Sequence, residues 1–291
     1  MSEEVKTLVN EYQEGKMSRR QFIRKAVLIA GSVELAMKLI GFFSPSVARA
    51  AMVDPQDPTL VSSELKYKGK AGQVSAYLSR PKASGTYPGL IVIHENRGIN
   101  DHIRDVARRL AKEGYVALAP DYLSRLGGTK KVNPKGKGIR GLRKMISTEA
   151  IIEDTKSGYS YLQSLSAVQG GRIGIVGFCW GGANAFMLTT KVRGLKAAVI
   201  YYGTTPRPID LVQNIEAPIL AHYGGADKRV SKGVPATVEA MKKYHKSFTY
   251  KVYPGAKHAF NNDTRASRYH PEAAKEAWGR TLRFFKKHLK G

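Results

Sequence analysis

The amino-acid sequence predicts an α/β fold in which a doubly wound, mostly parallel sheet is covered by helices on both faces. Two observations predict it. Strand-like and helix-like segments alternate over residues 65–291. Most of the strand-like segments are also continuous apolar runs, the pattern of strands buried on both faces. These runs are YPGLIVIHE (87–95), YVALAPD (115–121), GRIGIVGF (171–178), LKAAVIYYG (195–203) and APILAHYGG (217–225).

The remaining elements follow from residue periodicity and from helix caps. QVSAYLSR (73–80) shows a period-two alternation of residue types, which indicates a partly exposed strand. SFTYKVYPG (247–255) supplies the last strand. The segment 101–114 has helical spacing, with Asp101 as its N-cap and Gly114 at its end. We expect further helices and one long basic loop: helices at 145–165, 182–191, 232–245 and 270–289, and the loop at 122–144.

The charge of the chain is strongly basic. Lys and Arg number 48 against 23 Asp and Glu, which gives a formal net charge of +25. Such an excess attracts polyanions without specificity. The basic residues are nevertheless spread along the chain, with one dense patch at 129–144, and the sequence has no zinc-finger spacing, RNA-binding aromatic motif or internal repeat. We therefore expect a solvated basic surface and no specific nucleic-acid partner.

The first fifty residues have the features of an export signal. MSRRQFIRKAVLIAG (17–31) carries the paired arginines Arg19 and Arg20, and an apolar stretch follows them. SVARAA (46–51) has the small-x-small pattern of a signal-peptidase site, with cleavage expected after Ala50. The segment resembles a twin-arginine signal, which implies recognition by the export machinery and a periplasmic or secreted protein.

An alternative for this segment is a short amphipathic or anchoring helix, because Glu34 and Lys38 are spaced to pair on one helical face. The predicted organisation is a signal peptide at 1–50, a linker at 51–64 and a single domain at 65–291.

The hexapeptide GFCWGG (177–182) holds the only cysteine of the chain. It follows a predicted buried strand and precedes a predicted helix, the context of a nucleophile elbow. The turn is so sharp that side chains two residues before and after the nucleophile would collide, which explains Gly177 and Gly181. The start of a helix also favours ionisation of a thiol. We therefore predict that Cys179 is a nucleophile.

Two further residues complete a candidate triad. Asp227 and His258 each follow a predicted strand, and their order after Cys179 is the nucleophile–acid–histidine order of hydrolases with such an elbow. Because parallel strands end at one edge of a sheet, we expect the three side chains to meet there.

A second carboxylate, Glu95, ends the buried strand at 87–95 and reaches the same edge. An alternative is a glutamate that leads into the next helix or forms an ion pair. The loop that it opens commonly supplies a backbone amide to the oxyanion hole, so we predict that the N–H groups of Asn96 and Trp180 form it.

The segments HENRGIN, GFCWGG, GGAD and YPGAKHAFNND together resemble the dienelactone hydrolase (carboxymethylenebutenolidase) family, over residues 65–290. The resemblance implies an α/β-hydrolase fold. It also implies a triad of Cys179, Asp227 and His258, with Glu95 helping to ionise the thiol when substrate arrives.

The sequence departs from this family at one position. Where the family has an arginine that binds the carboxylate of the substrate, this chain has Asn262. Replacement of a guanidinium by an amide removes a charged clamp. Nearby arginines could restore an anion site, and the candidates are Arg265 and Arg268 downstream and Arg140 and Arg143 in the basic loop.

We therefore expect a monomeric cysteine hydrolase that acts on a small-molecule ester or lactone, with no metal and no organic cofactor. Two alternatives stay open at this point. One is a serine-type esterase or peptidase, although no other G-x-S-x-G motif occurs. The other is a degenerate hydrolase fold that binds anions or anionic polymers through residues 129–144.

Overall fold

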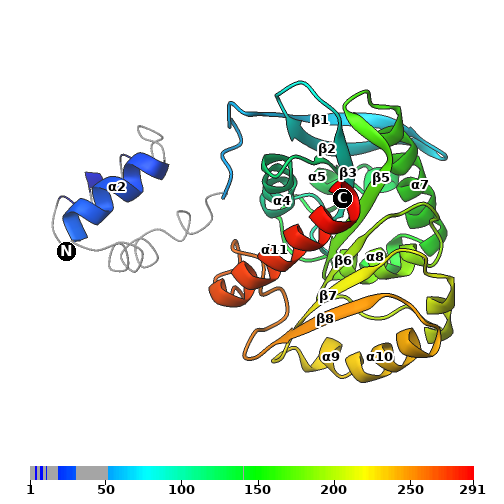
Figure 1. Ribbon diagram of the computed structural model, residues 1–291. Coiled ribbons are helices and arrows are strands. Elements are labelled where there is room, and N and C mark those ends of the chain that lie inside the picture. The colour runs from blue at the N-terminus through cyan, green and yellow to red at the C-terminus, as the bar shows by residue number, and fades with distance from the viewer. Residues whose placement is uncertain (1–3, 5–6, 9–10, 12–18, 31–51, 140) are drawn as a thin grey trace. The chain divides into compact units, whose positions relative to one another are not determined.

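The computed structural model describes residues 4, 7–8, 11, 19–30, 52–139 and 141–291 (Figure 1). The chain forms two compact units, one of residues 1–50 with 263–267 and one of residues 51–262 with 268–291.

Helix α2 (Arg19–Ala30) belongs to the first unit, and Arg19 and Arg20 are its first two residues. Phe22 on this helix is buried. Within the described ranges, no helix is both long enough and apolar enough to cross a membrane. The predicted cleavage position after Ala50, together with Glu34 and Lys38, lies outside the described residues.

The second unit is built on one eight-stranded sheet, in the order β1-β2-β4-β3-β5-β6-β7-β8 (Figure 1). Strand β2 pairs antiparallel with β1 and β4, and every other pairing is parallel. This confirms the predicted α/β class. The strands are β1 (Leu60–Gly69), β2 (Gly72–Pro81), β3 (Tyr87–Ile93), β4 (Val116–Pro120), β5 (Val168–Phe178), β6 (Ala198–Tyr201), β7 (Ile219–Gly224) and β8 (Phe248–Tyr253).

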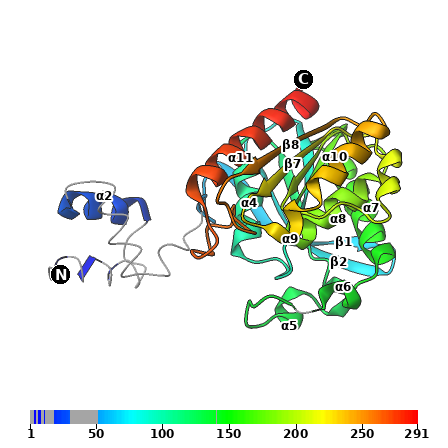
Figure 2. The same cartoon turned by 90° about the horizontal axis from the view of Figure 1, so that it is seen from below.

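Helices cover both faces of this sheet, as the two views show (Figure 1, Figure 2). One face carries α4 (Asp101–Lys112) and α11 (Pro271–Phe285). The other carries α7 (Thr148–Ser164), α8 (Trp180–Thr189) and α10 (Val234–Lys243). Short helices fill the connections: η2 (Ser124–Leu126), α5 (Thr129–Val132), α6 (Leu142–Met145), η3 (Ile209–Asn214) and α9 (Lys228–Ser231). A further short helix, η4 (Lys286–Lys290), continues from α11.

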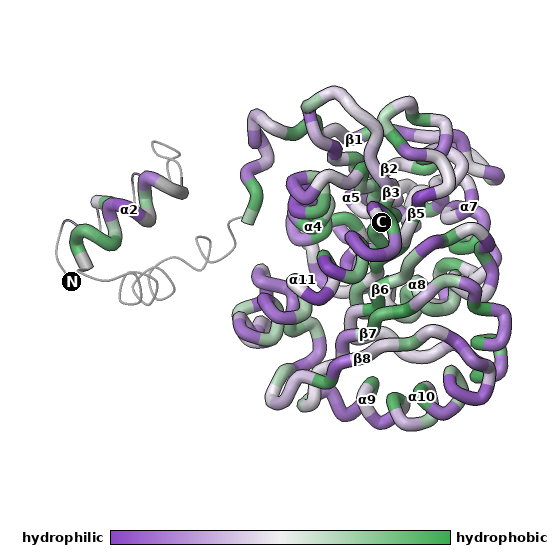
Figure 3. Tube along the Cα trace, in the orientation of Figure 1, coloured by the Kyte–Doolittle hydropathy of each residue, from purple (hydrophilic) through white to green (hydrophobic). Residues whose placement is uncertain are grey.

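Strand β3 shows why its apolar run is continuous. Leu90 and Val92 are fully buried in the layer of α4 and α11, whereas Ile91 and Ile93 are fully buried in the layer of α7 and α8. Because successive side chains point to opposite faces, a strand that is covered twice needs apolar residues at every position. Burial of each such side chain contributes about 1.5–3 kcal/mol to the free energy of folding. The central strands are accordingly hydrophobic along the backbone trace (Figure 3).

The predicted linker at 51–64 is too long, because β1 already begins at Leu60. Most residues of β1 are exposed or half-buried, so its sequence lacks the apolar run that marks the inner strands. The preceding residues are also tied down. The Val53 N–H donates to the Asp105 carboxylate, and the Val53 carbonyl accepts from Arg108 of α4.

The predicted basic loop at 122–144 contains η2, α5 and α6. These helices are three or four residues long, too short for a periodic pattern to reveal them in the sequence. In the view from below, α5 and α6 lie in a segment that projects from the body of the domain (Figure 2).

Candidate active site

The turn from β5 into α8 has the geometry of an elbow. Cys179 has φ 57° and ψ −112°, a conformation that is strained for any residue with a side chain. A Cβ atom on Gly177 would lie 2.0 Å from the carbonyl oxygen of Gly181. A Cβ atom on Gly181 would lie 2.4 Å from the carbonyl oxygens of Ile93 and His94. Backbone therefore occupies the space on both sides, and only glycine fits at either position.

Three side chains from different strand ends meet at this elbow. Asp227 follows β7 and caps α9, and His258 follows β8. The His258 ring lies between the other two side chains, with Nε2 2.9 Å from Cys179 Sγ and Nδ1 2.5 Å from Asp227 Oδ2. The arrangement can transfer a proton between the thiol and the imidazole while the carboxylate orients the ring.

The charges of these groups support one another. Burial lowers the pKa of His258, but hydrogen bonds to Asp227 and Cys179 outweigh it and raise the pKa to about 9. Burial raises the pKa of the Asp227 carboxyl, and the hydrogen bond from His258 outweighs that effect, so this pKa is lowered. The imidazolium and the carboxylate are thus the favoured forms at neutral pH.

Glu95 lies in a buried polar cluster beside the triad. Its side chain is 1% exposed, and its Oε2 accepts a hydrogen bond of 2.7 Å from Asn262 Nδ2. The hydroxyl of Tyr202 lies 3.5 Å from Glu95 Oε1, and the Tyr202 ring packs edge-on against His258 at 5.1 Å between centroids. Tyr202 thus connects Glu95 to the triad.

Tyr202 was not among the residues predicted from the sequence. Burial and the neighbouring Glu95 and Cys179 raise its pKa well above the usual value for tyrosine. It directly follows β6, so the strand-end argument that found Asp227 and His258 could also have found it. In the sequence Tyr202 belongs to the apolar run at 195–203, which is typical of core residues.

The candidate oxyanion donors lie where β3 and β5 end. Ile93 pairs with Gly177 in the sheet, and the His94 ring stacks on the Trp180 ring at 5.2 Å. Trp180 is the first residue of α8, so its N–H has no acceptor within that helix. Asn96 lies in the turn closed by a hydrogen bond from the Gly98 N–H to the Glu95 carbonyl.

The segment after β4 holds this turn in place. The Asp121 carboxylate accepts bonds from the backbone N–H and the hydroxyl of Thr129, and the Thr129 hydroxyl accepts from the Ile99 N–H. Farther along, the Ile139 N–H donates to the Asn96 carbonyl at 2.8 Å. The basic segment therefore packs directly against the turn that carries Glu95 and Asn96.

The predicted substrate-binding residues fall in different places. Asn262 is buried, and its amide donates to Glu95, which differs from a role as an open substrate ligand. Arg265 lies in 263–267, which belongs to the first unit, and Arg268 is exposed. Arg143 is a residue of α6, and Arg140 lies outside the described residues. The structure therefore places Asn262 in the polar cluster of Glu95.

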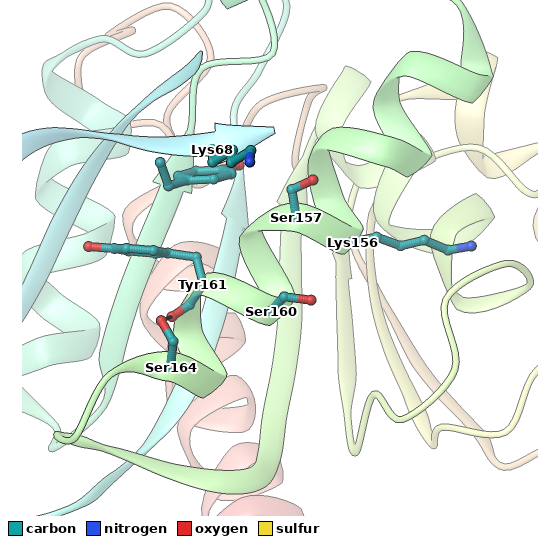
Figure 4. A pocket seen from close by; sticks show the side chains of 7 residues that line it. Lys68, Lys156, Ser157, Ser160, Tyr161 and Ser164 are labelled. Atoms are coloured by element: carbon teal, nitrogen blue, oxygen red, sulfur yellow. Dashed lines mark hydrogen bonds between the residues drawn. The ribbon is translucent and has the colours of Figure 1, made fainter. Parts of the chain in front are cut away.

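Two hollows on the domain differ in their relation to the elbow. A pocket of about 390 Å³, named here the elbow pocket, begins at Trp180 and lies between α8, residues 204–207 and residues 146–151. A second hollow of about 430 Å³, the β1–α7 hollow, is lined by lysines, serines and two stacked tyrosines (Figure 4). Among the residues that the structure describes, no three His, Cys, Asp or Glu side chains are placed to hold a metal ion.

Known proteins resemble this chain in sequence and in fold. The family model "Dienelactone hydrolase family" matches residues 74–289. A protein of Saccharolobus solfataricus named "Putative carboxymethylenebutenolidase" is 34% identical, over 78% of this chain and 99% of its own length. One of the same name from Synechocystis sp. is 36% identical, over 75% and 93%. The crystal structure titled "Putative Dienelactone Hydrolase" from Klebsiella pneumoniae superposes with a TM-score of 0.72 at 32% identity, over 78% of this chain and 99% of that one. The chain therefore belongs to the dienelactone hydrolase family of α/β-hydrolases, a family of carboxylic ester and lactone hydrolases.

Proposed function

We propose that this enzyme hydrolyses its ester or lactone through a Cys179–His258–Asp227 triad, with the thiolate as nucleophile. One observation carries the proposal. Two hydrogen bonds form a continuous chain from Sγ through the imidazole to the carboxylate, at the point where β5, β7 and β8 end. Each member has the chemistry that its position requires: a nucleophile, a base and an orienting acid.

The reaction begins when Cys179 Sγ attacks the carbonyl carbon and the carbonyl oxygen becomes an oxyanion. The N–H groups of Trp180 and Asn96 stabilise this charge. The tetrahedral intermediate then collapses, the C–O bond to the leaving group breaks, and His258 Nε2 gives its proton to the leaving oxygen. The product is a thioester between Cys179 and the acyl group.

The second half regenerates the enzyme. A water molecule attacks the thioester carbon while His258 Nε2 takes a proton from it. The C–S bond breaks, the free acid leaves, and sulfur returns as a thiolate that faces the imidazolium. Asp227 keeps the ring oriented and stabilises its positive charge in both halves. We propose that Glu95 adjusts the ionisation of the thiol through Tyr202, which contacts both Glu95 and the His258 ring.

The decisive experiment compares ester turnover by the full chain and by Cys179→Ala. We expect kcat to fall by about 10³-fold or more, because removing one member of a triad disables the unit. Ser160→Ala, in the β1–α7 hollow, is the matched control and should retain wild-type turnover. Activity retained by Cys179→Ala would refute the assignment.

A labelling experiment separates catalysis from the basic-module alternative. Cys179 should react with iodoacetamide, and an ester substrate should change the rate of this reaction. Salt-sensitive binding of a polyanion such as heparin, without ester turnover, would instead favour a binding module.

We also propose that residues 1–50 direct twin-arginine export. The support is the paired Arg19 and Arg20 in the sequence, followed by an apolar stretch and SVARAA. Cell fractionation of the full-length protein should find it outside the cytoplasm, with a new N-terminus at Ala51. Replacement of both arginines by lysine should retain the uncleaved protein in the cytoplasm. Export of that variant at the wild-type level would refute the proposal.

A further inference from the structure

His94 is a buried histidine that directly precedes Glu95 and takes no part in the triad. Its ring stacks on the Trp180 ring, at 5.2 Å between centroids and 12° between the planes. The Tyr122 ring packs edge-on against both of these rings, at 5.6 and 6.0 Å between centroids. The Tyr122 hydroxyl is itself bonded to the Thr155 hydroxyl at 2.8 Å. Three interlocked rings therefore hold the imidazole in one orientation.

The tautomer of His94 follows from its hydrogen bonding. Nδ1 lies 2.7 Å from the carbonyl oxygen of Glu95, and burial lowers the pKa of His94, so the ring is neutral at neutral pH. A neutral imidazole carries one N–H group and a carbonyl oxygen can only accept, so the proton is on Nδ1. Nε2 is buried and forms no hydrogen bond within the part of the chain that the structure describes. Replacing this ring by a phenyl ring would therefore remove one described hydrogen bond, the bond to Glu95.

The Glu95 carbonyl belongs to the same peptide group as the Asn96 N–H, which is proposed above to stabilise the oxyanion. A trans peptide group is planar, so its C=O and N–H point in opposite directions. The carbonyl also accepts from the Gly98 N–H, but at 3.3 Å, which is longer than the 2.7 Å bond from His94. A contact that fixes this carbonyl therefore also fixes the direction of the Asn96 N–H.

The other side of the turn is bonded to the basic segment. The Asn96 carbonyl accepts from the Ile139 N–H at 2.8 Å, and the Arg97 carbonyl accepts from Asn133 Nδ2 at 2.9 Å. These two bonds hold the two peptide groups that follow Asn96. The peptide group that precedes Asn96 is outside them, and His94 supplies its shortest hydrogen bond.

We infer that His94 is a positioning residue, whose Nδ1–H holds the peptide between Glu95 and Asn96 so that the Asn96 N–H points to the oxyanion. Its ring also stacks on Trp180, whose N–H is the second proposed donor, so one side chain contacts both parts of the oxyanion hole. Donors that are oriented in advance stabilise the developing charge without reorganising during the reaction. The inference rests on the proposed function, because it requires an oxyanion formed by attack of Cys179 on a carbonyl.

The test varies the N–H donor and the ring of residue 94 separately. His94→Phe keeps an aromatic ring beside Trp180 but has no donor. His94→Asn has no ring, but its Nδ2 is attached to Cγ as the Nδ1 of histidine is, so it can donate to the same carbonyl. His94→Leu has neither feature. For each variant, kcat and KM are measured on p-nitrophenyl acetate, and stability is measured as the midpoint of urea unfolding.

We expect kcat to follow the donor and stability to follow the ring. Both halves of the reaction pass through an oxyanion, and loss of a whole oxyanion donor costs about 10²–10³-fold in kcat. A misdirected donor should cost less, so kcat should fall by about tenfold to 10²-fold in His94→Phe and His94→Leu, with KM within about twofold. His94→Asn should keep kcat within about threefold of the wild type, although it should unfold at a lower urea concentration than His94→Phe.

Alkylation of Cys179 by iodoacetamide is the second readout. This reaction displaces iodide from a saturated carbon and forms no oxyanion, so it reports the thiolate alone. Its rate in His94→Phe should stay within about twofold of the wild-type rate while kcat falls. A parallel fall in alkylation and kcat would show that the substitution disturbs the thiol itself, and would contradict the inference.

The failure of this inference and the failure of the proposed function give different results. If His94→Phe and His94→Leu keep wild-type kcat, or if kcat falls as far in His94→Asn as in His94→Phe, the positioning role is wrong. The proposed function still stands in that case, provided that Cys179→Ala loses ester turnover. If Cys179→Ala retains turnover, the proposed function fails instead. His94→Leu supplies the donor-free comparison if His94→Phe does not fold.

Discussion

The elbow pocket and the β1–α7 hollow have similar volumes, about 390 and about 430 Å³, but only one of them adjoins reactive groups. The elbow pocket includes Trp180, which directly follows Cys179, and residues 204–207, which come shortly after Tyr202. The β1–α7 hollow is lined by residues of β1 and α7, among them Lys68 and Lys156 (Figure 4). Size therefore does not identify the site in this molecule. Its place at the carboxyl edge of the sheet does, because that edge collects side chains from several strands.

After Cys179→Ala, the largest effect should come from Asp227→Asn. The amide cannot stabilise the imidazolium or hold the ring tautomer as the carboxylate does, so we expect kcat for ester hydrolysis to fall by about 10³-fold. Steady-state kinetics on p-nitrophenyl acetate measures it. Lys156→Ala in the β1–α7 hollow should leave kcat unchanged within about twofold. A loss of less than tenfold in Asp227→Asn would contradict the role of Asp227.

The second prediction concerns the two ends of β5. Gly177→Ala would place a Cβ atom 2.0 Å from a backbone oxygen, and we expect it to lower the free energy of unfolding by about 3 kcal/mol. Gly170→Ala meets no atom within 4 Å and should change stability by less than about 0.5 kcal/mol. Urea unfolding followed by circular dichroism measures both. Equal stability of the two variants would show that the elbow is not tightly packed.

The third prediction is a pH profile. His258 has a pKa of about 9 in the folded enzyme against an ordinary value of 6.5, so the protonated ring persists until the pH rises through about 9. For an alkyl ester, whose leaving alkoxide needs that proton, kcat/KM should fall about tenfold per pH unit above this value. A pH-stat assay on ethyl butyrate measures it.

The same shift has a consequence for stability. Because the folded-state pKa of His258 is raised, its contribution to stability is complete below about pH 6.5 and is lost as the pH rises through about 9. In Asp227→Asn the fall of kcat/KM at alkaline pH should begin at lower pH, since the hydrogen bond that raises the pKa of His258 is weakened. An unchanged onset of this fall would assign the titration to another group.

The smallest effect should follow from changes in the β1–α7 hollow. Replacing Lys68 and Lys156 together by alanine removes two surface charges near the stacked rings of Tyr67 and Tyr161. We expect ester turnover to stay within about twofold and the free energy of unfolding within about 0.5 kcal/mol. A large loss of turnover would give this hollow a role in the reaction, and would remove the contrast with the elbow pocket.

Much of the fold could be predicted because its inner strands are covered on both faces. β3, β5 and β7 are continuous apolar runs, and each lies within a few residues of its expected range. The first residues of β1, at 60–64, fall in the predicted linker because exposed positions dilute the apolar pattern of the strand. The short helices of residues 124–145 were missed for a similar reason, since one turn of helix has no periodicity to detect.

The amino-acid sequence alone places Cys179, Asp227 and His258 after buried strands, and they meet because the ends of parallel strands share an edge of the sheet. Which other side chains join them depends on how the chain packs in three dimensions. Tyr202, which follows β6, reaches Glu95, which follows β3, past the end of β5. Asn262 bonds to Glu95 although 167 positions separate them. The residue pattern predicts where each strand ends, whereas the direction of a side chain depends on the neighbours that pack around it.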